Sequence, residues 1–124
     1  QNEGKENLNE PLYSLKHLNL ISNGKKEFVD KMVVLFVNDT PAYLQDLSNA
    51  YKDNDVIAFS KHLHKLKPRL AHFELHSVSA MATKMQSIIK EQGLEFPNKF
   101  MVQEFITTIE LCINDLKKNH LNQL

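Results

Sequence analysis

The chain has 124 residues, and its 15 Lys and Arg side chains match 15 Asp and Glu side chains to give a formal net charge of +0. This length suits one domain with a modest core. The balanced charge argues against a general nucleic-acid or anionic-membrane binder, because such proteins carry excess positive charge. The single cysteine, Cys112, excludes an internal disulfide and a cysteine-based metal cluster. No apolar run approaches the roughly 18 residues that span a bilayer, so we expect a cytoplasmic protein.

The first residues of the chain are polar and precede any apolar cluster. We therefore expect residues 1–12 to be a polar linker or remnant and residues 13–122 to form one domain. The start at Gln1 favours a module cut from something larger, such as a membrane-bound hybrid kinase, over a free-standing protein.

The pattern of residues predicts helices almost throughout, because only 3 Gly and 4 Pro occur and no strand-like alternation is visible. A short helix over residues 12–21 is followed by Gly24, a plausible C-terminal cap. The next segment, residues 25–51, favours one long helix kinked at Pro41. Alternatively, Thr40 caps a second helix that has Pro41 in its first turn.

Three further amphipathic helices are expected. Asp55 would cap the first, a break near residues 72–76 would separate it from the second, and Pro97–Asn98 would open the last. The expected inward positions include 32, 36, 43, 47 and 51, then Val56, Phe59, Leu63, Leu66, Leu70 and Phe73, then Val78, Met81, Ala82, Met85, Ile88 and Ile89, and finally Val102, Phe105, Ile106, Ile109, Cys112, Ile113 and Leu116. The predicted fold class is all-α: an antiparallel up-down four-helix bundle with a short extra N-terminal helix.

The stretch HLHKLKPRL, residues 62–70, carries polar residues that the core does not explain. At about 100° per residue, His64 falls roughly 120° from the centre of the apolar stripe, at the edge of the solvent face. Lys61 and Lys67 lie one turn to either side of it. A histidine flanked by cations in this way is an accessible nucleophile beside groups that bind anions.

Imidazole suits one chemistry at such a position. Its neutral nitrogen can attack a phosphoryl group, hold it covalently and pass it on. Nearby ammonium groups disfavour the imidazolium form and offset the charge of the phosphoryl oxygens. The chain has no glycine-rich nucleotide loop, since its three glycines are isolated, so another protein would have to load and unload His64.

The sequence resembles the histidine-containing phosphotransfer (HPt) domain of two-component phosphorelays. The core signature of that family is a histidine, a variable residue, leucine, lysine and usually glycine, and here it reads His64–Lys65–Leu66–Lys67–Pro68. The order of turns and helices in GKKEFVDKMVVLFVNDTPAYLQDLSNAYKDNDVIAFSKHLHKLK also follows the family. The resemblance covers about residues 13 to 118, with one specific motif inside a generic helical pattern.

By this resemblance, His64 is the phosphoacceptor, which exchanges phosphate with an aspartate of a response-regulator receiver domain, and Lys67 steadies the phosphohistidine. The partner would dock on exposed residues around them, among them Ile57, Ser60, Lys61, Pro68 and Ala71. The protein would be a carrier rather than an enzyme, with no cofactor of its own, because Mg²⁺ belongs to the receiver. We expect a monomer that binds neither nucleic acid nor membrane, with a hybrid sensor histidine kinase as a further candidate partner.

Two departures from the family pattern stand out. Pro68 replaces the usual glycine, lacks an N–H and presses on the carbonyl of His64, which implies a bend or loosening there. Further along the chain, the bulkier His72, Phe73 and Glu74 replace the small residues of the family. We expect them to alter the receiver contact at the C-terminal end of this helix.

Other interpretations of these residues remain open. HPt-like docking of a receiver without phosphate transfer is the main alternative, and His64 would then be an idle surface histidine. A zinc site could draw on His62, His64, His72 and His76, but a helix end between the last two spoils the spacing. Nucleic-acid binding through the cations of residues 61–69 is disfavoured, because no aromatic residue interleaves with them.

Overall fold

The computed structural model describes residues 12–93 and 95–121 of the chain, and this part contains helices and no strand. The helices are α2 (Lys16–Ile21), α3 (Lys26–Lys52), α4 (Val56–His72), α5 (His76–Glu91) and α6 (Lys99–Asn119).

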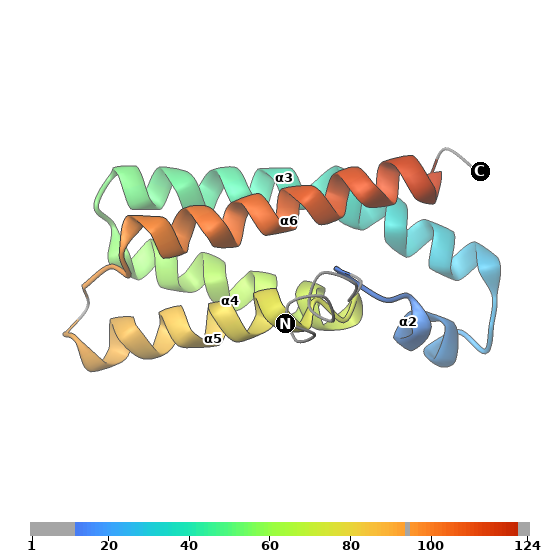
Figure 1. Cartoon of the computed structure of the whole chain (residues 1–124), viewed down its shortest axis with the longest axis horizontal. Coiled ribbons are helices and arrows are strands. Elements are labelled where there is room, and N and C mark those ends of the chain that lie inside the picture. Colours follow the sequence, from blue (N-terminus) through green and yellow to red (C-terminus); the bar gives the residue numbers. More distant parts are fainter. Residues whose placement is uncertain (1–11, 94, 122–124) are drawn as a thin grey trace, which may run out of the picture.

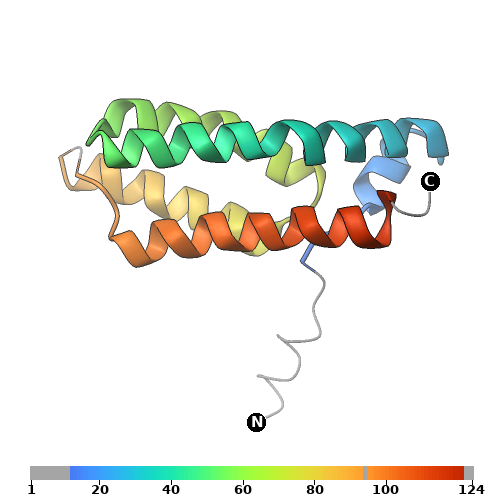
Figure 2. The same cartoon turned by 90° about the horizontal axis from the view of Figure 1, so that it is seen from above.

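Helices α3 to α6 form an antiparallel four-helix bundle in which each helix packs against the next, and α6 returns to α3 (Figures 1 and 2). The short α2 lies across one end, beside the start of α3, and buries Leu18 completely. The predicted fold class is thus confirmed. The core contains Phe36, Phe59, Phe73 and Phe105, which are almost wholly buried.

The ends of the bundle helices follow local rules of capping. Asp55 Oδ1 accepts a hydrogen bond from the backbone N of Ala58 at 3.1 Å, as expected for the cap of α4. Asn98 does the same at the start of α6, where its Oδ1 accepts from the N of Met101 at 2.9 Å. Gly93, beyond the end of α5, has a φ of +68°, a conformation that glycine adopts without strain.

Pro41 lies inside α3, which runs without a break from Lys26 to Lys52. One long helix, the interpretation favoured from the sequence, is therefore correct. In Figure 1 the N-terminal part of α3 slopes away from the line of the rest, as a proline-bent helix does. Thr40 does not cap a second helix, because it is fully buried and its Oγ1 has no hydrogen-bond partner.

The buried face of α3 is rotated from the predicted one. Of the expected positions, Phe36 and Leu47 are buried, whereas Met32, Tyr43 and Tyr51 are only half-buried. The centre of the buried face is instead formed by Val29, Val33, Val37, Thr40 and Leu44. Because α3 packs against both α4 and α6, its buried face is wider than one stripe, and the periodicity of the large residues alone misplaces its centre.

The turn between α4 and α5 holds α2 in place. The backbone N of Ser14 donates to the carbonyl of Phe73 at 2.9 Å, and the N of His17 donates to Glu74 Oε2 at 3.0 Å. This backbone hydrogen bond lowers the pKa of Glu74. The Phe73 ring is buried and lies 4.4 Å from the ring of Phe36. Phe73 and Glu74, two of the bulky departures from the family pattern, therefore serve the attachment of α2.

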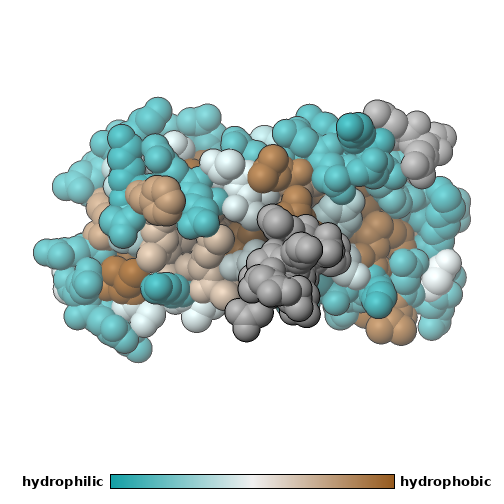
Figure 3. All heavy atoms as spheres, viewed as in Figure 1, coloured by the Kyte–Doolittle hydropathy of each residue, from teal (hydrophilic) through white to brown (hydrophobic). Residues whose placement is uncertain are grey.

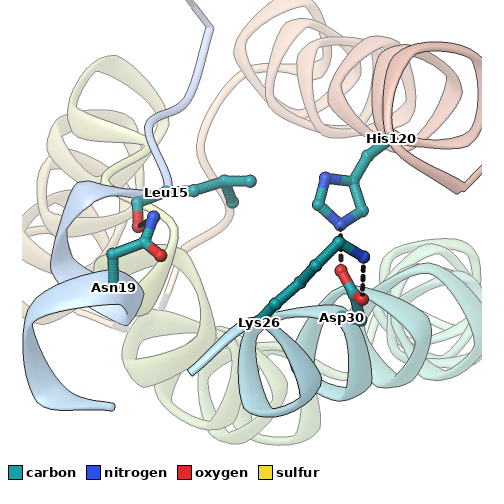
Figure 4. Close-up of polar contacts among 5 residues, drawn as sticks. All are labelled: Leu15, Asn19, Lys26, Asp30 and His120. Carbon is teal, nitrogen blue, oxygen red and sulfur yellow. Dashed lines mark hydrogen bonds and ion pairs between the residues drawn. The ribbon is translucent and has the colours of Figure 1, made fainter. Parts of the chain in front are cut away.

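The residue that follows α6, His120, is tied to the first turns of α3 by a polar cluster (Figure 4). Asp30 accepts hydrogen bonds from Lys26 Nζ at 2.6 Å and from His120 Nε2 at 2.8 Å. Asp30 and His120 are both about one-fifth exposed, so solvent screens this contact less than a fully exposed pair. The hydrogen bonds from Lys26 and His120 hold the pKa of Asp30 below its ordinary value.

We predict that Asp30→Asn lowers the Tm at neutral pH. A carboxyl group with a depressed pKa stabilises the folded state above its ordinary pKa of 3.8, and this contribution is lost as the pH falls through the folded-state value. Thermal melts from pH 7 to pH 3 should therefore show a gap between variant and parent that closes at the acid end. Asp46→Asn, at an exposed site on the same helix, is the control and should show a smaller gap. A gap of constant size would contradict the assignment.

Candidate functional site: an exposed histidine on α4

His64 lies on the solvent-facing side of α4, and its exposure, predicted from the sequence, is confirmed. The opposite side of α4 is formed by Phe59, Leu63, Leu66 and Leu70, all with 0% exposure. His64 points outward because it lies roughly 120° around the helix from the centre of this buried side. The packing of α4 thus sets the direction of the imidazole.

His64 lines an open hollow of about 450 Å³ on the α4–α5 surface. The other residues around this hollow are Ile57, Ser60, Lys61, Lys65 and Gln86. Three of the five predicted docking residues therefore surround the imidazole, and Ile57 offers an apolar surface that is 55% exposed. A partner atom can reach the ring from solvent without any rearrangement of the bundle.

Lys67 is held against the neighbouring helix rather than extended into solvent. Its Nζ donates a hydrogen bond to Gln86 Oε1 at 3.1 Å, and the lysine is half-buried. An ammonium group has three donors, so two remain after this bond. Lys67 follows His64 by three residues, about one turn of helix, so its charge is anchored at the side of the hollow.

Gln86 was not singled out from the sequence. It lies on α5 at the edge of the buried stripe, immediately after Met85, and no motif marks it. Only the packing of α4 against α5 brings it to Lys67, 19 residues away in the chain. The sequence marks Gln86 only as a polar residue at the boundary of an apolar stripe. Many surface residues occupy such positions, so this feature does not identify a functional residue.

The remaining predicted docking residues extend beyond the hollow. Pro68 is exposed and lines a second groove of about 420 Å³ between α3 and α4, which Lys65 and Leu35 also line. Arg69 closes part of this groove, with its guanidinium 4.4 Å from the centre of the Tyr43 ring. Ala71 is exposed near the end of α4, outside the residues that line the hollow.

Pro68 does not end α4, which continues to His72. With no N–H at position 68, the carbonyl of His64 lacks the donor that an α-helix would supply four residues later. Figures 1 and 2 show the last part of α4 turning away from the line of its first part, as the sequence implied. The buried side chains on both sides of Pro68, Leu66 and Leu70, keep the helix docked across this weak point.

The other candidate ligands do not gather near His64. His62 is half-buried, and its Nδ1 is buried without a hydrogen-bond partner. The ring of His72 stacks instead on that of His17 of α2, with centroids 5.8 Å apart. Within residues 12–93 and 95–121, no three His, Cys, Asp or Glu side chains are placed to hold a metal ion. Cys112 is buried, and this burial raises the pKa of its thiol to about 11, so it is a poor nucleophile.

The fold and the site together define an all-helical protein that presents a histidine, flanked by cations, on the outside of a four-helix bundle. A family model described as Hpt domain matches residues 31–119, which is most of the chain. The chain therefore belongs to the Hpt domain family. Hpt domains act in histidine phosphotransfer in two-component phosphorelays and interact with the receiver domains of response regulators. No curated protein and no solved structure matches the chain significantly. None of the helices in the described part is both long and apolar enough to cross a bilayer.

We predict that Pro68→Ala raises the free energy of unfolding by about 1–3 kcal/mol, because alanine restores a donor for the His64 carbonyl and removes the ring clash. Urea denaturation of the variant and the parent measures the change. Pro41→Ala in α3 makes the same exchange away from His64 and should also stabilise the fold. An unchanged or lower stability of Pro68→Ala would show that the surrounding packing has adapted to the proline.

Proposed function

We propose that His64 is the phosphoacceptor of this Hpt domain and carries a phosphoryl group to and from the aspartates of receiver domains. The observation that carries the proposal is the exposed imidazole in an open hollow, with the ammonium of Lys67 anchored one turn away. The match to the Hpt family supports the reaction class, and the signature His64–Lys65–Leu66–Lys67 supports the residue.

The proposed step is a direct exchange of one bond for another. A neutral imidazole nitrogen of His64 attacks the phosphorus of an aspartyl phosphate, an N–P bond forms and the acyl O–P bond breaks. The electron pair of that bond leaves with the aspartate as a free carboxylate. The reverse step returns the phosphoryl group to another aspartate, and the Mg²⁺ that assists both steps is expected on the receiver.

The role proposed for Lys67 and Gln86 is to place positive charge beside the phosphoryl oxygens. Phosphoryl transfer depends mostly on positioning and charge compensation, so a fixed ammonium is more effective than a mobile one. The hydrogen bond to Gln86 restricts the lysine side chain before any partner binds. Gln86 also lines the hollow, so its amide would be a second polar group near the transferred phosphoryl.

We predict that His64 alone accepts the phosphoryl group. Purified receiver domains, loaded with radiolabelled phosphate, should transfer label to the parent protein, and His64→Gln should abolish the transfer while circular dichroism shows an intact fold. The label should be acid-labile and base-stable, as a phosphoimidazole is. His62→Gln is the matched control, a second histidine of α4 two residues away, and should keep its label.

Two results would overturn this assignment. Label that survives in His64→Gln and disappears in His62→Gln would move the acceptor. Measurable binding of receivers without transfer from any of them would favour an adaptor that docks receivers and carries no phosphate.

We predict that Lys67 contributes to the transfer step and little to the stability of the fold. Lys67→Ala should slow transfer about 10-fold or more, which corresponds to about 1.4 kcal/mol of transition-state stabilisation, without lowering the Tm appreciably. Gln86→Ala should slow it less, because the lysine charge stays nearby. The two effects should not add in the double variant, since both act through one contact. Lys84→Ala, at an exposed lysine of α5, is the control; a similar loss in this variant would remove the special role of Lys67.

A further inference from the structure

The positive charge of this neutral protein is concentrated on α4. The helix carries Lys61, Lys65, Lys67 and Arg69 and contains no Asp or Glu between Val56 and His72. The first turn of α4 also holds no Asp or Glu, and the carboxylate at that end of the helix is the capping Asp55. By contrast, α6 has carboxylates at Glu104, Glu110 and Asp115 among its lysines.

Three of these cations form a row along one side of α4. Lys61, Lys65 and Arg69 follow one another at intervals of four residues, and we call them the cationic row. Like charges at this spacing repel across one turn and destabilise a helix. The opposite arrangement occurs at Lys26 of α3, which pairs with Asp30 four residues later at 2.6 Å.

No carboxylate compensates the cationic row within ion-pair distance. In the described part of the chain, no Asp or Glu oxygen lies within 4.0 Å of the charged atoms of Lys61, Lys65 or Arg69. Asp39 of α3 lines the same groove as Lys65 and Arg69 without forming an ion pair with either. The guanidinium of Arg69 is held by Tyr43, whose hydroxyl accepts a hydrogen bond from Nη2 at 3.2 Å.

The row lies beside the proposed phosphoacceptor. Lys61 and Lys65 are exposed and line the hollow with His64, and Lys65 also lines the α3–α4 groove with Arg69. A partner that reaches His64 must therefore approach a set of cations that repel one another in the free protein. An acidic partner surface would relieve this repulsion and gain long-range attraction.

We propose that the cationic row is a docking element that selects a partner with an acidic surface and steers it onto His64. The proposal rests on the function proposed above and names its partner more closely: a receiver domain whose docking surface carries an excess of carboxylates. The row acts on the rate of encounter and on the choice of partner, whereas Lys67 acts on the transfer itself.

The test is Lys65→Glu, which turns the row into alternating charges that attract one another. We expect the Tm to rise by about 2 °C, because two repulsive pairs become attractive. We also expect the association rate constant with an unphosphorylated receiver, chosen from those that bind the parent, to fall about 10-fold at low ionic strength. The difference should shrink at 0.5 M salt, roughly the range in which exposed charges are screened.

The matched control is Lys84→Glu, the same charge change at an exposed site of α5. Lys84 is two residues from Gln86, so it points away from the α4 side, and its variant should leave both the Tm and the association rate nearly unchanged. Association is measured instead of transfer, because a carboxylate next to His64 also alters the chemistry.

An association rate that does not change in Lys65→Glu, or that changes equally in Lys84→Glu, would overturn the proposal. The proposal would also be overturned if the parent bound a labelled 20-nucleotide single-stranded DNA more tightly than any receiver. The row would then be a binding site for nucleic acid. Salt-dependent association that Lys65→Glu weakens, without label on His64, would leave the docking row in place and refute the phosphoacceptor. Label on His64, together with an association rate that Lys65→Glu leaves unchanged, would support the phosphoacceptor and refute the docking row.

Discussion

The packing of the apolar side of α4 is the constraint on which the site depends. Phe59, Leu63, Leu66 and Leu70 are completely buried, and their removal from water is worth about 1.5–3 kcal/mol for each side chain. Because this side cannot rotate without exposing them, the packing of α4 fixes the direction of His64. The imidazole is oriented by the core side chains of its own helix and stays exposed to solvent.

The same packing explains how α4 accommodates Pro68. A proline inside a helix removes a hydrogen bond and would end an isolated helix of this length. Here Leu66 and Leu70 hold both sides of the proline in the core, so the helix continues to His72. Contacts with other helices therefore stabilise a helical segment that the local sequence alone would not maintain. The carbonyl that loses its donor belongs to His64, the histidine of the family signature.

The sequence predicts those features that depend on neighbours along one helix. The four helices of the bundle, the cap at Asp55 and the exposure of His64 all follow from periodicity and capping rules. Features that depend on contacts between helices were not predictable in this way. The hydrogen bond from Lys67 to Gln86 joins two helices. Likewise, the attachment of α2 through Glu74 spans 57 residues of the chain from His17, and the wide buried face of α3 reflects two packing partners at once.

The separation of core and surface on α4 has a consequence for how such a domain can diversify. The residues around the hollow, such as Ile57 and Lys61, are exposed and contribute little to the core. Substitutions at exposed positions of this kind usually change folding stability by about 0.5 kcal/mol or less. Single substitutions around the imidazole can therefore change the binding preference step by step, while the core that orients the imidazole stays the same.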